Sequence, residues 1–88
     1  MEKDMKFYKV QVDGEVTTLA NGELETLQEA VGGYIERLVA SPSMDMYVNE
    51  EGLLHGLPIN VMATALAKRH IVGDVVVAIE NDTQTQIK

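Results

Sequence analysis

Residues 71–79 read IVGDVVVAI, and the rest of the architecture can be worked out from this stretch. Val75–Ile79 is a continuous apolar run that follows the turn residues Gly73 and Asp74. A short run without polar alternation is typical of a strand that is buried on both of its faces. The sequence therefore predicts a central strand here, and the remaining elements must flank it and cover it.

Two hairpins are expected to supply the other strands. Met5–Val12 alternates apolar and polar residues, Glu15–Leu19 is again strand-like, and Asp13-Gly14 separates them. The Asp-Gly pair predicts a type I′ turn, which needs positive φ at both of its central residues. A second hairpin joins Tyr34–Ala40 to Met44–Asn49. We expect the central strand to pair with the first strand of the chain.

A first short helix follows the first hairpin. Glu23–Val31 carries an apolar stripe formed by Leu24, Leu27 and Val31. Gly32-Gly33 is expected to end this helix, because a left-handed residue after the last turn is commonly glycine.

A second helix follows the stretch 49–60, which reads NEEGLLHGLPIN. It begins near Pro58 or Asn60, since Pro is tolerated in a first turn and Asn is a good N-cap, and it continues to about Arg69. Leu53 and Leu54 are expected to extend a short strand or to pin the loop to the core. The residues expected to face the core from this helix are Val61, Met62, Ala65 and Leu66.

The resulting element order is ββαββαβ. It predicts an α+β domain in which two short helices pack on one face of a single sheet. Residues 1–80 are expected to form this single domain, and the polar segment 81–88 is expected to be a frayed tail.

Composition limits the functional classes. Seven Lys and Arg against 14 Asp and Glu give a net charge of -7, which argues against direct binding to a nucleic-acid backbone. The absence of a long apolar run argues against a membrane span and a secretory signal. Cys is absent, so disulfides and thiolate metal sites are excluded. We expect a cytoplasmic protein whose acidic surface either keeps it soluble or faces a basic partner.

Two glycine-containing stretches are the candidate ligand site. Gly32, Gly33 and Tyr34 would let a ligand approach the backbone and stack on the tyrosine, and they also fit a helix cap followed by a strand. Gly56, Leu57 and Asn60 place backbone amides at the start of the second helix, and they also fit a linker. Both interpretations remain open at this stage.

No catalytic or metal site is expected. His55 beside Glu50 and Glu51 is the only local set that resembles one, and its spacing matches no zinc motif. Lys68 and Arg69 are expected to complement the dipole at the end of the second helix. We therefore predict a protein without a cofactor and without enzymatic activity.

Three motifs in order carry a resemblance to a known family. They are LQEAVGGYIE (27–36), VNEEGLLHGLPINVMATAL (48–66) and IVGDVVV (71–77). In this order and spacing the chain resembles a small domain family of unknown function that is found in bacteriophages, plasmids, other mobile elements and some bacterial genomes. The resemblance implies a setting in mobile-element biology and implies no activity.

Three functions are compatible with these observations. The first is a non-catalytic accessory protein of a phage or mobile element that binds a host or phage protein, as in counter-defence or host takeover. The second is a protein that sequesters a small molecule or nucleotide, at a homodimer interface if the chain is a homo-oligomer. The third is an assembly module that pairs through an exposed sheet edge.

Overall fold

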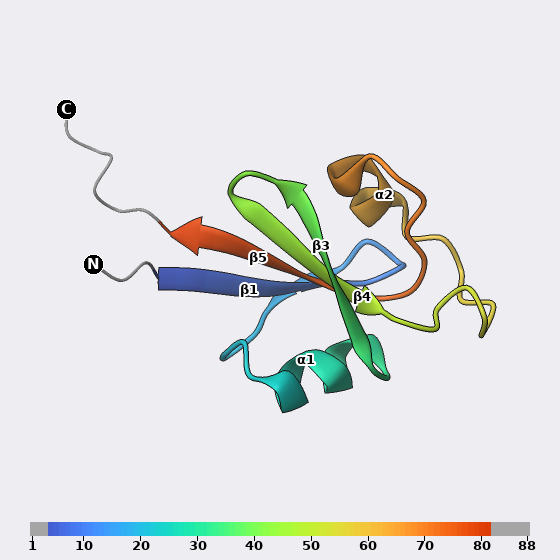
Figure 1. Cartoon of the computed structure of the whole chain (residues 1–88), viewed down its shortest axis with the longest axis horizontal. Helices are drawn as coiled ribbons and strands as arrows, with labels where there is room; N and C mark the ends of the chain where they lie inside the picture. The colour runs from blue at the N-terminus through green and yellow to red at the C-terminus, as the bar shows by residue number, and fades with distance from the viewer. Residues whose placement is uncertain (1–3, 82–88) are drawn as a thin grey trace.

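The computed structural model describes residues 4–81 and shows the α+β fold with the expected element order. Five antiparallel strands form one sheet in the order β2-β1-β5-β4-β3, and two helices cover it (Figure 1). The elements are β1 (Asp4–Val10), β2 (Val16–Thr18), α1 (Leu24–Val31), β3 (Ile35–Ser41), β4 (Met44–Asn49), α2 (Val61–Ala67) and β5 (Val75–Asn81).

The central position of β5 is confirmed. Val77 lies opposite Tyr8 of β1 on one side and opposite Met46 of β4 on the other. Val75 and Val76 are fully buried, as the continuous apolar run requires. β5 therefore joins the β1–β2 hairpin to the β3–β4 hairpin.

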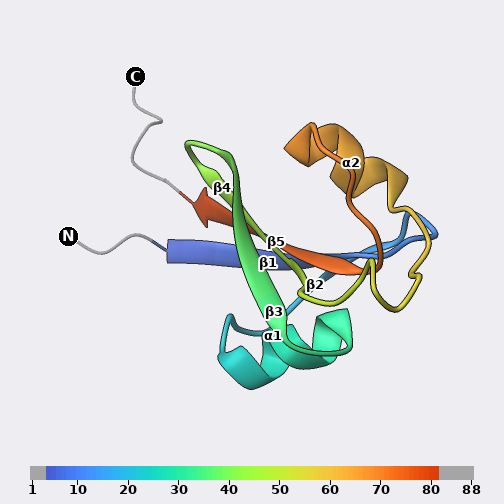
Figure 2. The same cartoon turned by 45° about the vertical axis from the view of Figure 1, so that its right-hand side comes forward.

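The prediction that both helices pack on one face of the sheet is wrong. Val75 and Val77 of β5 lie in one core with Ala63 of α2, whereas Val76 lies in a second core with Leu27 of α1. Successive side chains of a strand point to opposite faces, so the two helices cover opposite faces, as Figures 1 and 2 show. The reason is the apolar run itself, because a strand that is buried on both faces needs cover on both.

The first hairpin forms, but its turn differs from the predicted type I′. Gly14 has φ of 94°, whereas Asp13 is not in the left-handed region. The Gly14 amide donates to the Gln11 carbonyl at 2.9 Å, and the Asp13 carboxylate accepts from the Glu15 amide at 2.9 Å. This arrangement matches a turn followed by a left-handed glycine bulge, which needs positive φ only at the glycine. The longer loop also explains why β1 ends at Val10.

Helix α1 lies where the sequence predicts it. Gly32 ends it with φ of 81°, and Leu27 and Val31 face the core, while Leu24 is exposed. The N-terminal end is held by Asn21, whose Oδ1 accepts from the Glu23 amide at 2.9 Å and the Thr26 hydroxyl at 2.7 Å.

The predicted buried face of α2 is wrong. Ala63 is 0% exposed, whereas Val61 is 69% exposed, and Met62, Ala65 and Leu66 are also exposed. Thr64 explains the rotation of the helix. Its Oγ1 accepts from the Ile71 amide at 3.0 Å and donates to the Ile71 carbonyl at 3.2 Å, which turns this side of the helix toward the following segment. The helix also ends at Ala67 rather than near Arg69.

The loop between β4 and α2 is a series of turns without a strand. Leu53 and Leu54 neither extend a strand nor pin the loop to the core, because they are 74% and 80% exposed. Leu57 is the half-buried leucine of the loop, and its side chain packs against Gly73.

The C-terminal prediction can be followed in part. β5 continues through Asn81, which lies opposite Asp4. The remainder of the predicted tail, 82–88, lies outside the described residues. No helix within residues 4–81 has the length and apolar character needed to cross a membrane.

Candidate functional site

The structure brings Leu57 of the second candidate stretch near the first stretch at the end of α1, whereas Gly56 and Asn60 line neither hollow there. Gly32 lies on two adjoining hollows, one of ≈ 270 Å³ that includes Gly33 and Tyr34 and one of ≈ 450 Å³ that includes Leu57. The first hollow is completed by Gln28, Asn49, Glu51 and His55. Sequence reasoning did not connect Asn49 with this place, because it lies 16 residues from Gly33 at the end of an alternating strand.

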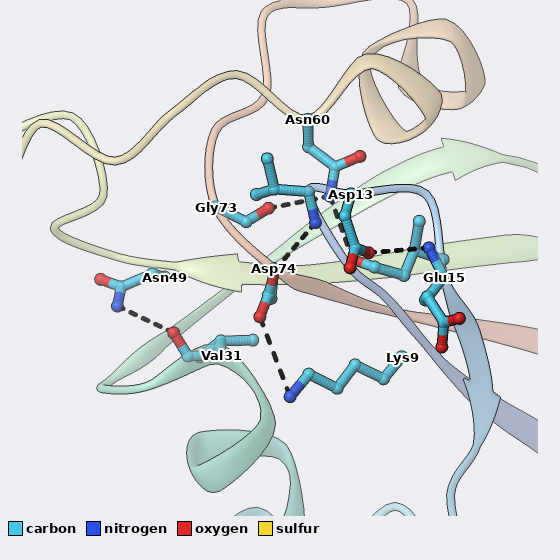
Figure 3. A network of polar contacts seen from close by, with 10 residues as sticks. Lys9, Asp13, Glu15, Val31, Asn49, Asn60, Gly73 and Asp74 are labelled. Atoms are coloured by element: carbon cyan, nitrogen blue, oxygen red, sulfur yellow. Dashed lines mark hydrogen bonds and ion pairs between the residues drawn. The ribbon is translucent and has the colours of Figure 1, made fainter.

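Asn49 holds the two sides of this first hollow together. Its Nδ2 donates to the Val31 carbonyl at 3.1 Å (Figure 3), and its Oδ1 accepts from the Glu51 amide at 2.8 Å. A Cβ at Gly33 would lie 3.0 Å from the same Nδ2, so a larger residue there would displace the Asn49 side chain slightly. Close packing against Asn49 therefore favours a glycine at this position.

Except for Tyr34, the residues of the candidate stretches have backbone amides that donate to internal acceptors. This removes the donors with which these stretches could bind an anion, because such sites depend on free amides. In each of these bonds the first residue's amide donates to the second residue's carbonyl: Gly32 to Gln28 at 2.8 Å, Gly33 to Gln28 at 3.1 Å, Gly56 to Leu53 at 3.1 Å, Leu57 to Gly52 at 3.0 Å and Asn60 to Ile71 at 2.8 Å.

Asn60 is a buried structural residue, 0% exposed. Its Oδ1 accepts from the Ala63 amide at 3.0 Å and caps α2 as the sequence predicts. Its Nδ2 donates to the Val10 carbonyl at 3.0 Å and to the Gly73 carbonyl at 2.9 Å (Figure 3). The side chain therefore joins the end of β1, the turn before β5 and the start of α2.

Asp74 reinforces the same junction. Its Oδ1 accepts from the Val12 amide at 2.9 Å, and its Oδ2 lies 3.8 Å from Lys9 Nζ (Figure 3). Among residues 4–81, every buried side-chain nitrogen or oxygen has a hydrogen-bond partner. A polar function of this part of the chain must therefore lie at its surface.

The histidine–carboxylate set is an exposed pair. His55 Nε2 lies 3.2 Å from Glu51 Oε1, one helical turn apart in sequence and open to solvent. Within residues 4–81, no group of three or more His, Asp or Glu side chains is placed to hold a metal ion.

The outward side of α2 is an apolar surface. We call the exposed residues Val61, Met62, Ala65 and Leu66 the α2 outer face. A surface helix normally carries charged or polar residues on its solvent side, and 61–67 contains no charged residue. This lack of charge is the signal in the sequence, and it is compatible both with burial and with an exposed apolar surface.

Comparison with known proteins gives one match, to a family model. Residues 5–87 match the family model for a domain of unknown function (DUF3846). No curated protein and no solved structure matches the chain. The match covers nearly all of the sequence, including the three motifs that carry the resemblance noted above. The chain therefore belongs to the DUF3846 family of domains of unknown function.

Proposed function

We propose that this protein is a non-catalytic accessory protein of a phage or other mobile element that acts in the cytoplasm by binding a host protein. The observation that carries the proposal is the α2 outer face. Val61, Met62 and Leu66 expose apolar side chains on one helix without an intervening charge. Contiguous apolar surface of this kind marks sites of protein interaction.

The outer face is suited to a partner rather than to the protein's own stability. Ala63, on the inner side of the same helix, belongs to the core, and the residues of the α2 outer face are not part of that core. Methionine contributes flexibility, which lets a contact surface adapt to its partner. The net charge of -7 adds long-range attraction toward a basic protein, and this attraction weakens as salt rises.

A second candidate is a protein that sequesters a small ligand in the ≈ 270 Å³ hollow. One observation favours it, because Tyr34 is 67% exposed at a hollow also lined by Gln28 and Glu51. The ligand would bind through these side chains, since the neighbouring glycine amides donate internally. The lining carboxylate favours a neutral or cationic ligand over a nucleotide phosphate.

Affinity purification from host cells tests the first candidate. The tagged protein is compared with the double variant V61K/L66K, and bound proteins and bound small molecules are both identified by mass spectrometry. We expect a stoichiometric host protein with the wild type and its loss with the double variant, because two ammonium groups interrupt the apolar surface. Val61 is 69% exposed, so V61K should change stability by only about 0.5 kcal/mol, whereas Leu66 is 37% exposed and L66K should cost about 1 kcal/mol. Circular dichroism checks that the double variant is folded.

A matched control uses an exposed valine elsewhere. Val16 lies on β2 and is 51% exposed, so V16K adds a lysine without touching α2. This variant should retain the partner. If the double variant V61K/L66K still captures the host protein, the proposal is contradicted. If the wild type instead captures a small molecule and the variant Y34A does not, the second candidate is favoured.

A further inference from the structure

The sheet has one long open edge. β3 ends the strand order at one side, and β2, which ends it at the other, is only three residues long. An edge strand presents backbone amides and carbonyls that can pair with another chain. The seven residues of β3 are therefore the longer of the two edges available for pairing.

The backbone direction along β3 follows from one hydrogen bond. The Glu50 amide donates to the Tyr34 carbonyl at 2.8 Å, so position 34 faces β4. The direction of the backbone N–H and C=O groups alternates along an antiparallel strand, so those of Glu36 and Leu38 also point toward β4. The backbone N–H and C=O groups of Ile35, Arg37 and Val39 point outward, away from the sheet. The irregularity of β3 begins only after Val39, which leaves 35–39 as a regular edge.

A hollow of ≈ 380 Å³ lies on the α2 side of this edge. Glu36 and Leu38 of β3 line it beside the edge, and the exposed leucines of the loop, Leu53 and Leu54, line it as well. Buried Ile71 contributes apolar surface. A side chain from a strand added next to β3 would enter this hollow.

The charge beside the edge is negative. Arg37 is balanced by Asp45, with 3.1 Å between Nε and Oδ2. The hollow is lined by three carboxylates, those of Glu36, Glu50 and Glu51, and by one guanidinium, that of Arg69, beside His70, so its charge is negative on balance. Neither Glu36 nor Glu50 has an ion-pair partner among residues 4–81. The strand that pairs here would therefore gain from a cationic side chain opposite Glu36.

A second copy of the chain fits this edge poorly. Consider two β3 strands, one from each copy, that pair antiparallel about a two-fold axis. If the axis passes through Glu36, the two copies of Glu36 lie directly opposite each other, and if it passes through Arg37, the two copies of Arg37 do. An axis through Leu38 brings the irregularity after Val39 into the new ladder. Like charges directly opposite are destabilising, and both copies carry a net charge of -7.

We propose that the β3 edge and the adjacent hollow bind an extended segment of the partner that places an apolar side chain in the hollow and a Lys or Arg beside Glu36. This inference rests on the proposed function and names the chemistry of the partner. Main-chain hydrogen bonds to positions 35, 37 and 39 hold the segment, and side-chain contacts on alternate residues select it.

A synthetic peptide tests the inference without the host protein. The probe is fluorescein-labelled Thr-Lys-Thr-Leu-Thr-Lys-Thr, which places Lys, Leu and Lys on one face of a strand, and a matched peptide has Glu for Lys. Binding is measured by fluorescence polarisation. We expect the lysine peptide to bind and the glutamate peptide to bind at least about tenfold more weakly.

Three variants separate backbone pairing from side-chain effects. R37P removes an outward amide while leaving the ladder to β4 intact, and it should weaken peptide binding at least about tenfold. R37A loses the same side chain but keeps the amide, so it should bind within about twofold of the wild type. E36K should weaken binding of the lysine peptide and strengthen binding of the glutamate peptide. If R37P does not fold, the result for E36K decides between the outcomes.

A proline on the opposite edge is the matched control. The Leu19 amide donates to the Phe7 carbonyl, and the Gln11 amide donates to the Glu15 carbonyl. Backbone groups alternate along β2, so the amide of Thr18, next to Leu19, points away from β1. T18P should bind the peptide within about twofold of the wild type.

The contrary outcomes are distinct from failure of the proposed function. Equal binding of R37P and wild type, or equal binding of the two peptides, overturns this inference and leaves the α2 test standing. A wild-type dimer that R37P converts to a monomer in light scattering would also overturn it, because a second copy would then occupy the edge. Failure of host-cell capture with intact peptide selectivity contradicts the proposed function and not the chemistry of the edge.

Discussion

Asn60 connects segments that are far apart in sequence. One amide side chain bonds to residues 50 positions before it and 13 positions after it, and it also caps its own helix. The sequence indicated the cap, because Asn before a helix is a common pattern. The donations to Val10 and Gly73 carry no local signal, and they depend on β1 and β5 lying side by side.

We expect N60D to destabilise the protein strongly, although Asp is an equally good N-cap in general. The substitution keeps an oxygen for the Ala63 amide but removes both donors, so a carboxylate faces the carbonyls of Val10 and Gly73. Leaving a buried acceptor unsatisfied costs about 1–3 kcal/mol, and two such losses should lower the free energy of unfolding by about 3 kcal/mol or more. Urea unfolding followed by circular dichroism measures the change.

The same substitution at Asn21 provides the control. Asn21 uses its side-chain oxygen to accept from Glu23 and Thr26, and an aspartate retains that function. N21D should therefore change the free energy of unfolding by only about 0.5 kcal/mol. Equal losses for N21D and N60D would show that the two donated bonds of Asn60 contribute nothing specific.

Among the elements, the hairpins and α1 were predictable because their signals are local. Alternation in 44–49, Asp-Gly at 13–14 and Gly32 after an apolar stripe each depend on neighbouring residues. The turn type differed because Asp13 bonds to the Glu15 amide, a choice that the dipeptide alone does not determine.

Helix α2 was placed correctly but turned the wrong way. Its sequence VMATALA has apolar residues all round, so periodicity cannot define a face. The polar Thr64 lies toward the protein because it bonds to Ile71, the reverse of the usual expectation for a polar residue. The α2 outer face is not predictable from periodicity for this reason. The candidate glycines stay a prediction, although their amides donate within the helix cap and the loop turns.

A pair of alanines in α2 tests which side is buried. Ala63 is 0% exposed and Ala65 is exposed, two positions along the same helix. A63L should lower the free energy of unfolding by about 1–3 kcal/mol, because extra methyl groups overfill a packed core. A65L should change it by only about 0.5 kcal/mol. Thermal or urea unfolding distinguishes this orientation from the reverse one, which would exchange the two results.

At the scale of the whole molecule, two cores share one sheet. α2 closes the core that contains Met46 and Val75, and α1 closes the core that contains Val76. The placement of the helices on opposite faces is not predictable from the order of the elements, because that order does not determine which face of the sheet a helix covers. The consequence for stability is that β5 contributes to both cores and to both hairpins.

Amide hydrogen exchange should reflect this arrangement. The amides of Val76–Ala78 should exchange most slowly, since β5 has neighbours on both sides and opens only with global unfolding. Along β3 the rates should alternate, with Arg37 faster than Glu36 and Leu38, because its amide points outward. Slow exchange at Arg37 in the isolated protein would show that the edge is covered and would contradict the open-edge description.

The central place of β5 also has a consequence for the order in which the protein is made. A ribosome releases the β1–β2 hairpin and the β3–β4 hairpin first, and the register of the sheet joins them only through 75–81. Isolated two-stranded hairpins are at best marginally stable in water. Neither helix therefore has a complete core to pack on until β5 has been synthesised. Until then the apolar surface on both faces of the sheet is accessible to chaperones and proteases.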